Sequence, residues 1–290
     1  MDNLKTPISF YIVAKDEIYW IEPCILSIAN IADEIIFVDN GSTDKTVLKV
    51  EQLKSKHNLN LKIFKEPKII DLADLRNFAI SKCSNAFIFV WDADFVAFED
   101  TSPHSLQKQL LYLEKNKAFD RYHRFMCKTP VMRVLLNQTW KTSHIHPLNC
   151  AMFHKDYLEK VVVSNTHGWD ERIWKKGCKT FEMAGYYFIS VDVKSDLHFV
   201  YRVHRSKWRL FRRKMHLNLD HLSYLKEVLH KDASDLIKEL YSKKLIQFPY
   251  DVPLILKNYV KNPPYHLIFR DNKIIGRRFD YERLNKLEIG

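Results

Sequence analysis

The chain has 290 residues, of which 46% are hydrophobic and 28% charged, and its apolar runs are far shorter than the roughly 20 residues of a membrane-spanning helix. The 5 cysteines form no C-x-x-C pair, which argues against a disulfide framework and a zinc site, and "MDNLKTPISF" lacks an apolar signal region, so we expect a cytoplasmic protein. Most of the net charge of +11 lies in residues 201–290, which indicates an anionic partner there: a phosphate-bearing substrate, an acidic membrane surface or nucleic acid.

Strand and helix patterns alternate over the first third of the chain. We expect strands at residues 8–15, 34–40, 61–66 and 86–91, and helices at 18–30, 42–56 and 71–83. This alternation is typical of βαβ units and predicts an α/β fold with a mostly parallel, doubly wound sheet flanked by helices. Ligands of such sheets bind beyond the carboxyl ends of the strands.

Polar and mostly acidic residues follow three of these strands. Asp92 and Asp94 come directly after the apolar run "FIFVW", Lys15-Asp16-Glu17 follow the first strand, and Asp39-Asn40 follow the second. Two carboxylates this close raise each other's pKa unless a cation neutralises them. Mg²⁺ or Mn²⁺ would do so, because these ions take one or two protein carboxylates together with substrate phosphates and water. The pattern therefore predicts a site at this edge of the sheet.

The loop "VDNGSTD" (38–44) is the second element of the expected site. Asn-Gly alone would indicate a hairpin, but a helix pattern follows it, which favours a strand-to-helix loop. Gly41 would let the backbone pass close to a ligand, and the helix that begins after it would present N–H groups to a phosphate or to ribose hydroxyls.

Four motifs together resemble those of family 2 glycosyltransferases. "VAKDE", "VDNGSTD", "LADLRN" and "FVWDAD" occur in that family's order and at roughly its spacing, and the likeness extends more loosely to "GWDE" at 168–171. The resemblance implies an A-type glycosyltransferase fold and an inverting, metal-dependent transfer of a sugar from a nucleoside-diphosphate donor, with UDP-sugars favoured. Residues 1–200 would form the catalytic domain, with 1–100 binding the nucleotide sugar and 101–200 the acceptor.

The resemblance also implies roles for individual residues. The nucleotide-binding set would be Ala14, Lys15, Glu17, Asp39, Asn40, Gly41, Arg76 and Asp92. In that set Asp39 would bind the nucleobase, and Arg76 would sit near the pyrophosphate or brace the metal-binding loop. Asp92 and Asp94 would hold Mn²⁺ or Mg²⁺ on the diphosphate, and the metal would stabilise the leaving group. His198, after a predicted strand, is a further candidate ligand of the metal or a phosphate.

An inverting transferase needs a general base within reach of the acceptor hydroxyl. Family members often carry Gly-Gly-Phe-Asp-Glu followed by a Glu-Asp pair whose Asp is the base. This chain keeps Gly168-Trp169-Asp170-Glu171 but has no Glu-Asp after it. Glu182 is the leading candidate for the base, with Asp170 and Glu171 behind it.

The remaining chain gives weaker patterns. We expect a helix at 105–116, strands at 122–136, 148–154 and 185–193, a basic helical region at 205–244, and an irregular tail at 245–290. Residues 201–290 are thus predicted to be a basic, mainly helical C-terminal extension. Within it, the run 202–214 has seven basic residues and no acid, and is compatible with a solvated helix face or with an interfacial helix on anionic lipid.

The expected acceptor is a glycan or lipid-linked glycan, in the synthesis of a cell-surface polysaccharide or glycolipid at the inner face of the membrane. A sugar-phosphate nucleotidyltransferase is an alternative, but it needs a glycine-rich loop after the first strand, where this chain reads "AKDEIYW". A non-catalytic module that binds a nucleotide sugar is a second alternative, because the Glu-Asp pair is missing. A nucleic-acid binder would leave the carboxylates unexplained, so we expect no nucleic-acid partner.

Overall fold

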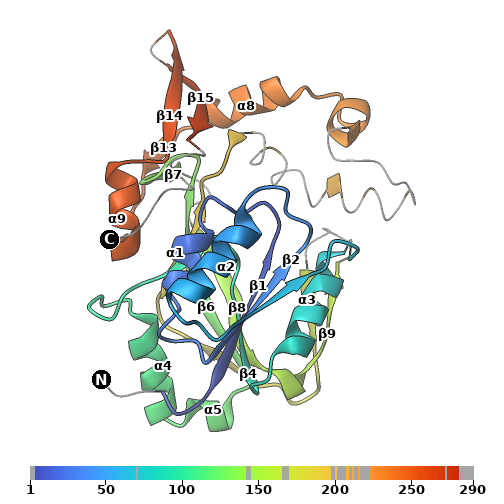
Figure 1. Ribbon diagram of the computed structural model, residues 1–290, viewed down its shortest axis with the longest axis vertical. Helices are drawn as coiled ribbons and strands as arrows, with labels where there is room; N and C mark the ends of the chain where they lie inside the picture. Colours follow the sequence, from blue (N-terminus) through green and yellow to red (C-terminus); the bar gives the residue numbers. More distant parts are fainter. Residues whose placement is uncertain are drawn as a thin grey trace.

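The computed structural model describes residues 4–69, 71–141, 145–164, 170–196, 200, 207–208, 211, 215, 223–271 and 273–280. In this part of the chain, a sheet of 9 strands runs through the molecule with helices on both faces (Figure 1). Its strand order is β3-β2-β1-β4-β8-β6-β12-β5, with β11 paired to β6. No helix within the described residues is long and apolar enough to cross a membrane.

One half of the sheet is parallel, as predicted. Its strands are β1 (Ile8–Ala14), β2 (Glu34–Asp39), β3 (Leu61–Lys65) and β4 (Phe87–Val90), and its helices are α1 (Ile21–Leu26), α2 (Thr46–Lys56) and α3 (Leu72–Lys82). The pairs β1–β2, β2–β3 and β1–β4 all run parallel. Every residue of β2 and β4 is buried, because helices cover both faces. The prediction of an α/β fold is confirmed, although α1 is shorter than the helix expected at 18–30.

The other half of the sheet is mixed. It contains β5 (Phe95–Ala97), β6 (Arg124–Arg133), β8 (Ile145–His154), β11 (Thr180–Glu182) and β12 (Phe188–Asp192), and the helices α4 (Leu106–Lys115) and α5 (Ala118–Arg121). β8 runs antiparallel to both β4 and β6, and β5 runs antiparallel to β12. The strands expected at 122–136, 148–154 and 185–193 are therefore present. β5 and β11 were not predicted, because three residues are too few for a periodic pattern.

The two faces of β1 belong to different cores. Phe10 and Ile12 pack into a cluster that includes side chains of α1, α2 and α4. Tyr11, which points to the opposite face, packs into a cluster with α3 and β9 (Leu158–Val163). β9 pairs with β10 (Asp170–Trp174), and the side chain of Asn77 on α3 bonds both the N–H and the C=O of Val161 in β9. This amide fixes the β9–β10 hairpin against α3.

The C-terminal part contains more regular structure than predicted. It has a short π-helix, η2 (Tyr224–Val228), the helices α8 (Ala233–Ser242) and α9 (Leu254–Lys261), β13 (Leu245–Gln247), which pairs with β7 (Gln138–Trp140), and a hairpin of β14 (Tyr265–Arg270) and β15 (Lys273–Phe279). The prediction of an irregular tail from 245 is wrong. Its prolines lie at element boundaries: Pro253 caps α9, and Pro263-Pro264 separate α9 from β14.

The C-terminal elements gather at the top of Figure 1 and share a hydrophobic core with the sheet. The loop after β1 enters this core through two aromatic pairs. Tyr19 meets Phe279 of β15 at a ring-centroid distance of 4.7 Å, and Trp20 meets Tyr259 of α9 at 5.6 Å. The loop that follows the first strand is thereby packed against the C-terminal part. Most of the run 202–214 lies outside the described residues.

Candidate active site

The loops that follow β1 and β2 are joined by side-chain-to-backbone hydrogen bonds. The carboxylate of Asp16 accepts from the N–H of Thr43 at 2.6 Å and of Asp44 at 3.2 Å. In return, the N–H of Asp16 donates to Ser42 Oγ, and that of Glu17 donates to Thr46 Oγ1, both at 2.9 Å. The two loops therefore form one continuous rim at the carboxyl end of the sheet.

Asp39 lies at the end of β2 and holds its own loop. Its carboxylate, 4% exposed, accepts from the N–H groups of Gly41 and Ser42 at 3.0 to 3.2 Å. Gly41 has φ +78°, and a Cβ there would lie 3.1 Å from Cβ of Pro67, so glycine is required. The Asn40 amide donates to the carbonyls of Glu66 and Ile69, so it holds the loop after β3.

Arg76 on α3 is the centre of a first cluster of charged groups. Its side chain is 12% exposed; Nη2 donates to Asp92 Oδ1 at 3.0 Å and Nε donates to Asp170 Oδ2 at 2.5 Å. Nη1 donates to the buried Tyr11 hydroxyl at 3.2 Å. Burial disfavours the charged guanidinium, but Tyr11, Asp92 and Asp170 outweigh this and raise the pKa of Arg76 well above its usual value. The guanidinium of Arg76 therefore stays protonated and positively charged.

This cluster places two carboxylates beside each other. Nε and Nη2 form one edge of a planar guanidinium, so Asp92 and Asp170, bound there, are neighbours. Asp170 Oδ1 is buried and has no hydrogen-bond partner among the residues that the structure describes, whereas Asp92 has 39% of its side chain exposed. An unpaired buried carboxylate oxygen is costly, and a hydroxyl group or a cation would satisfy it.

Lys194, two residues after the end of β12, is the centre of a second cluster of charged groups. Its Nζ lies 2.6 Å from both carboxylate oxygens of Glu17 and 3.7 Å from Oδ2 of Asp94. Lys194 and Asp94 are almost fully buried, with 1% and 2% of their side chains exposed. Sequence reasoning missed Lys194. The sequence did contain a signal for it: in "FISVDVK" (188–194) a mostly apolar strand is followed by a charged residue, as in "FIFVWDAD".

The donor chemistry of this rim suits a hard divalent cation. Asp92 and Asp94 offer carboxylate oxygens, and Asp170 is bound to the same guanidinium as Asp92. Among the residues that the structure describes, no group of three or more His, Cys, Asp or Glu side chains could hold a metal alone. Since Mg²⁺ and Mn²⁺ need only one or two protein carboxylates, substrate phosphates would complete the coordination.

The other predicted residues are placed as follows. Ala14 is buried at the end of β1 and Lys15 is exposed on the rim. Glu182 is exposed on the short strand β11, which pairs with β6, and belongs to neither cluster. Glu171 is exposed and, because side chains alternate along a strand, faces away from Asp170. His198 and Gly168-Trp169 lie outside the described residues.

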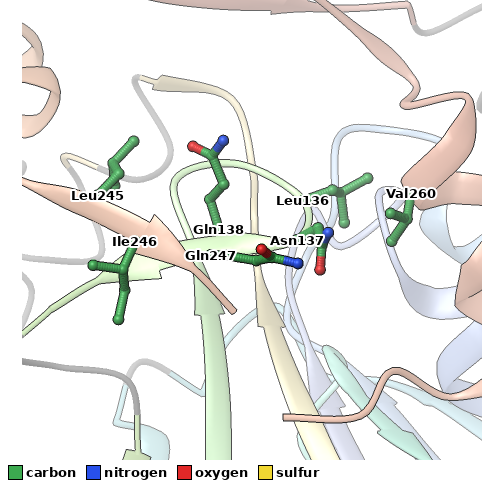
Figure 2. A pocket seen from close by; sticks show the side chains of 7 residues that line it. All are labelled: Leu136, Asn137, Gln138, Leu245, Ile246, Gln247 and Val260. Atoms are coloured by element: carbon green, nitrogen blue, oxygen red, sulfur yellow. The ribbon is translucent and has the colours of Figure 1, made fainter. Parts of the chain in front are cut away.

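A cavity of about 500 Å³ lies apart from both clusters (Figure 2). It is lined by Leu136, Asn137, Gln138, Leu245, Ile246, Gln247 and Val260, from β7, β13, α9 and the turn before β7. None of these side chains carries a charge. The cavity therefore lacks the carboxylates and cations that a nucleoside diphosphate site needs.

Relatives in several Rickettsia species are similar over part of the chain. An uncharacterized glycosyltransferase of Rickettsia bellii is 36% identical over 129 residues, which cover 44% of this chain and 40% of that protein. One from Rickettsia typhi is 30% identical over 164 residues, 55% of this chain and 51% of that protein. The matched segments thus span about half, or less, of the length of these curated relatives.

Solved structures are similar at low sequence identity. TarS of S. aureus matches 80% of this chain and 42% of its own at 13% identity and a TM-score of 0.45. The mannosyltransferase PcManGT of Pyrobaculum calidifontis, in complex with GDP-Man and Mn²⁺, matches 79% of this chain and 70% of its own at 14% identity and a TM-score of 0.47. The model of glycosyl transferase family 2 matches residues 9–187, which include both clusters except Lys194. The chain belongs to glycosyl transferase family 2.

Proposed function

We propose that the chain transfers a sugar from a nucleoside-diphosphate donor, with UDP-sugars favoured, to a hydroxyl group of an acceptor, with inversion at the anomeric carbon. One observation carries the proposal. The ends of three neighbouring parallel strands bring Glu17, Asp39, Asp92 and Asp94 to one rim, where Arg76 and the buried Lys194 hold three of these four side chains in place. Carboxylates gathered at the carboxyl end of a parallel sheet suit a diphosphate bound through a metal.

On the donor side, the rim formed by the β1 and β2 loops would bind the nucleoside. Asp39, at the end of β2, is the proposed contact of the base, with Ala14, Lys15, Asn40 and Gly41 around it. Mn²⁺ or Mg²⁺, held by Asp92 and Asp94, would supply positive charge to the leaving diphosphate. His198 stays a prediction as a further ligand.

On the acceptor side, we assign the general base to Asp170 in preference to Glu182. Arg76 fixes Oδ2 of Asp170 and orients the carboxylate, while Oδ1, which has no hydrogen-bond partner in the described part of the chain, is left to accept a proton. As the acceptor oxygen attacks the anomeric carbon, its proton passes to Oδ1. The new C–O bond forms as the bond to the phosphate oxygen breaks, and that electron pair leaves with the diphosphate.

A glycan or lipid-linked glycan is the proposed acceptor, in the synthesis of a cell-surface polysaccharide or glycolipid. Its site would be built by residues 101–200, with 201–290 as an added unit. A contact of residues 202–215 with an anionic membrane surface, and a location at the inner face of the membrane, stay predictions from the charge of that region. A sugar-phosphate nucleotidyltransferase is disfavoured, because the loop after β1 has no glycine.

The base assignment is tested by comparing Asp170→Asn with Glu182→Gln. Release of nucleoside diphosphate is measured from UDP-glucose, UDP-N-acetylglucosamine and GDP-mannose, with water as the acceptor. We expect the wild type to consume one donor. Asp170→Asn should lower the rate about 10²–10⁴-fold, which is the usual contribution of a general base, with little change in donor binding. Glu182→Gln should stay close to wild type.

The opposite result, a loss of rate in Glu182→Gln with Asp170→Asn intact, would return the base to Glu182 and leave the transferase proposal standing. A wild type that binds these donors but consumes none of them would favour the non-catalytic module.

A further inference from the structure

Lys194 joins two loops of the proposed donor site with a single buried ammonium group. Glu17 follows β1 and Asp94 follows β4, and both carboxylates pair with Nζ of Lys194. The lysine comes from a third place, the segment that follows β12. Its position therefore fixes how the end of β4 lies relative to the loop after β1.

The ammonium also sets the orientation of a proposed metal ligand. Asp94 is 2% exposed, and a buried carboxylate without a compensating cation costs several kcal/mol. Removing Lys194 would leave the carboxylates of Glu17 and Asp94 close together and repelling each other. Groups that pair with a metal-ligating carboxylate orient it, and losing such a partner typically lowers metal affinity about 10–100-fold.

Lys194 is itself held by the C-terminal hairpin and α8. Arg277 on β15 donates from Nε to the carbonyl of Lys194 at 2.6 Å and from its backbone N–H to Asp196 Oδ2 at 2.8 Å. Tyr241 on α8 donates from its hydroxyl to Asp196 Oδ1 at 2.6 Å. Burial raises the pKa of Tyr241, so the hydroxyl keeps its proton. Two C-terminal elements thus converge on residues 194–196.

Two further contacts define how closely this segment is held. A Cβ on Gly276 of β15 would lie 3.1 Å from Asp196 Oδ2, so a larger residue there would have to displace the Asp196 carboxylate or the hairpin by a few tenths of an ångström. On the β1 side, Nε1 of Trp20 donates to the carbonyl of Val193 at 2.5 Å. The segment that carries Lys194 is therefore hydrogen-bonded on one side to the loop after β1 and on the other side to the C-terminal hairpin.

We propose that Lys194 is a positioning residue for the diphosphate-bound cation, and that the C-terminal hairpin sets its place through Asp196. The inference rests on the proposed function, because it concerns the same donor site. It makes the C-terminal part, which lies outside the residues matched by the family model, a working component of that site.

The test measures by calorimetry how many times more tightly UDP binds in saturating Mn²⁺ than in EDTA. Because the two UDP affinities in this ratio, the Mn²⁺ ratio, are measured on the same variant, a general loosening of the fold lowers both and leaves their ratio unchanged. The variants are Lys194→Met, Lys194→Gln in case the first does not fold, and Gly276→Val. Lys49→Met is the control for the lysine, because Lys49 is also a buried cation, paired with Glu22 at 3.2 Å. Phe269→Ser, at an exposed position of the same hairpin, is the control for Gly276.

We expect both Lys194 variants to lose a factor of about 10 or more from the Mn²⁺ ratio. Gly276→Val should lower it by a smaller factor, and the two controls should keep the wild-type ratio. A wild-type ratio in a folded Lys194 variant would overturn the proposal, and a wild-type ratio in Gly276→Val alone would remove the hairpin from it.

If UDP binds the wild type equally well in EDTA, the positioning role fails while donor binding stands. If UDP, GDP and ADP all fail to bind in either condition, the proposed function fails with it.

Discussion

At the scale of single residues, two cations organise the candidate site. Arg76 was predicted from its motif to lie near the pyrophosphate or to brace the metal-binding loop; in the structure it contacts Asp92, and both roles stay predictions. Its bond to Asp170 could not be read from the sequence, because the two residues are 94 positions apart. The pairing of Lys194 with Glu17 could not be read from the sequence either, because the two residues are 177 positions apart. Sequence motifs identified the carboxylates and Arg76, and the fold showed which carboxylates Arg76 and Lys194 pair with.

Glu34, at the opposite end of β2 from the site, provides a prediction on stability. Burial acts to raise the pKa of this carboxyl, but hydrogen bonds from Ser9, Ser84 and Lys62 outweigh it and lower the pKa to about 2, from 4.5. Since the folded-state pKa lies below the unfolded one, the unfolded chain binds more protons between these values. The contribution of Glu34 is therefore complete above about pH 4.5 and is lost as the pH falls towards 2.

We expect the unfolding free energy of the wild type to fall more steeply through this acidic range than that of Glu34→Gln. Urea unfolding at a series of pH values measures both slopes. Equal slopes would mean that Glu34 has an ordinary pKa in the folded protein.

At the scale of elements, α3 is the part that connects the two sides of the site. It carries Arg76 towards Asp92 and Asp170, and the adjacent Asn77 towards β9, so its position sets the distance between the proposed donor side and the proposed acceptor side. The strand-and-helix alternation predicted α3, since its pattern is long and regular. The β9–β10 hairpin was not predicted, because its strands are short and partly exposed.

The N-cap of α3 allows a matched test of this role. Asp71 accepts from the N–H of Ala73, and on α4 Ser105 accepts from the N–H of Lys108. Replacing either residue with Ala should cost about 1 kcal/mol of stability, because each leaves a helix N–H without its acceptor. Only Asp71→Ala should also weaken nucleoside diphosphate binding, since only α3 carries a residue of the site. Calorimetric titration of both variants decides this, and equal affinities would show that α3 tolerates local loosening.

At the scale of the whole molecule, the C-terminal part is continuous with the catalytic core. The sequence predicted a basic extension because its charge differs from that of the first 200 residues. Composition, however, gives no information on which residues pack together. In the structure, side chains from α8, α9, β14 and β15 share a hydrophobic cluster with β5 and β12. The boundary at residue 200 therefore stays a prediction. The hairpin escaped prediction because its strands carry charged residues in place of a clean apolar alternation.

The most direct test of the account is a thermal-shift measurement with UDP, GDP and ADP, each with and without Mn²⁺, on the wild type and on Asp94→Asn. A ligand at a hundred times its Kd stabilises the folded state by about 2.7 kcal/mol, which raises Tm by several degrees. We predict such a rise in the wild type with one nucleoside diphosphate and Mn²⁺, and its loss in a folded Asp94→Asn protein. An unchanged wild-type Tm with all three nucleotides would contradict the account, because the rim of Glu17, Asp39, Asp92 and Asp94 would then not be a nucleoside diphosphate site.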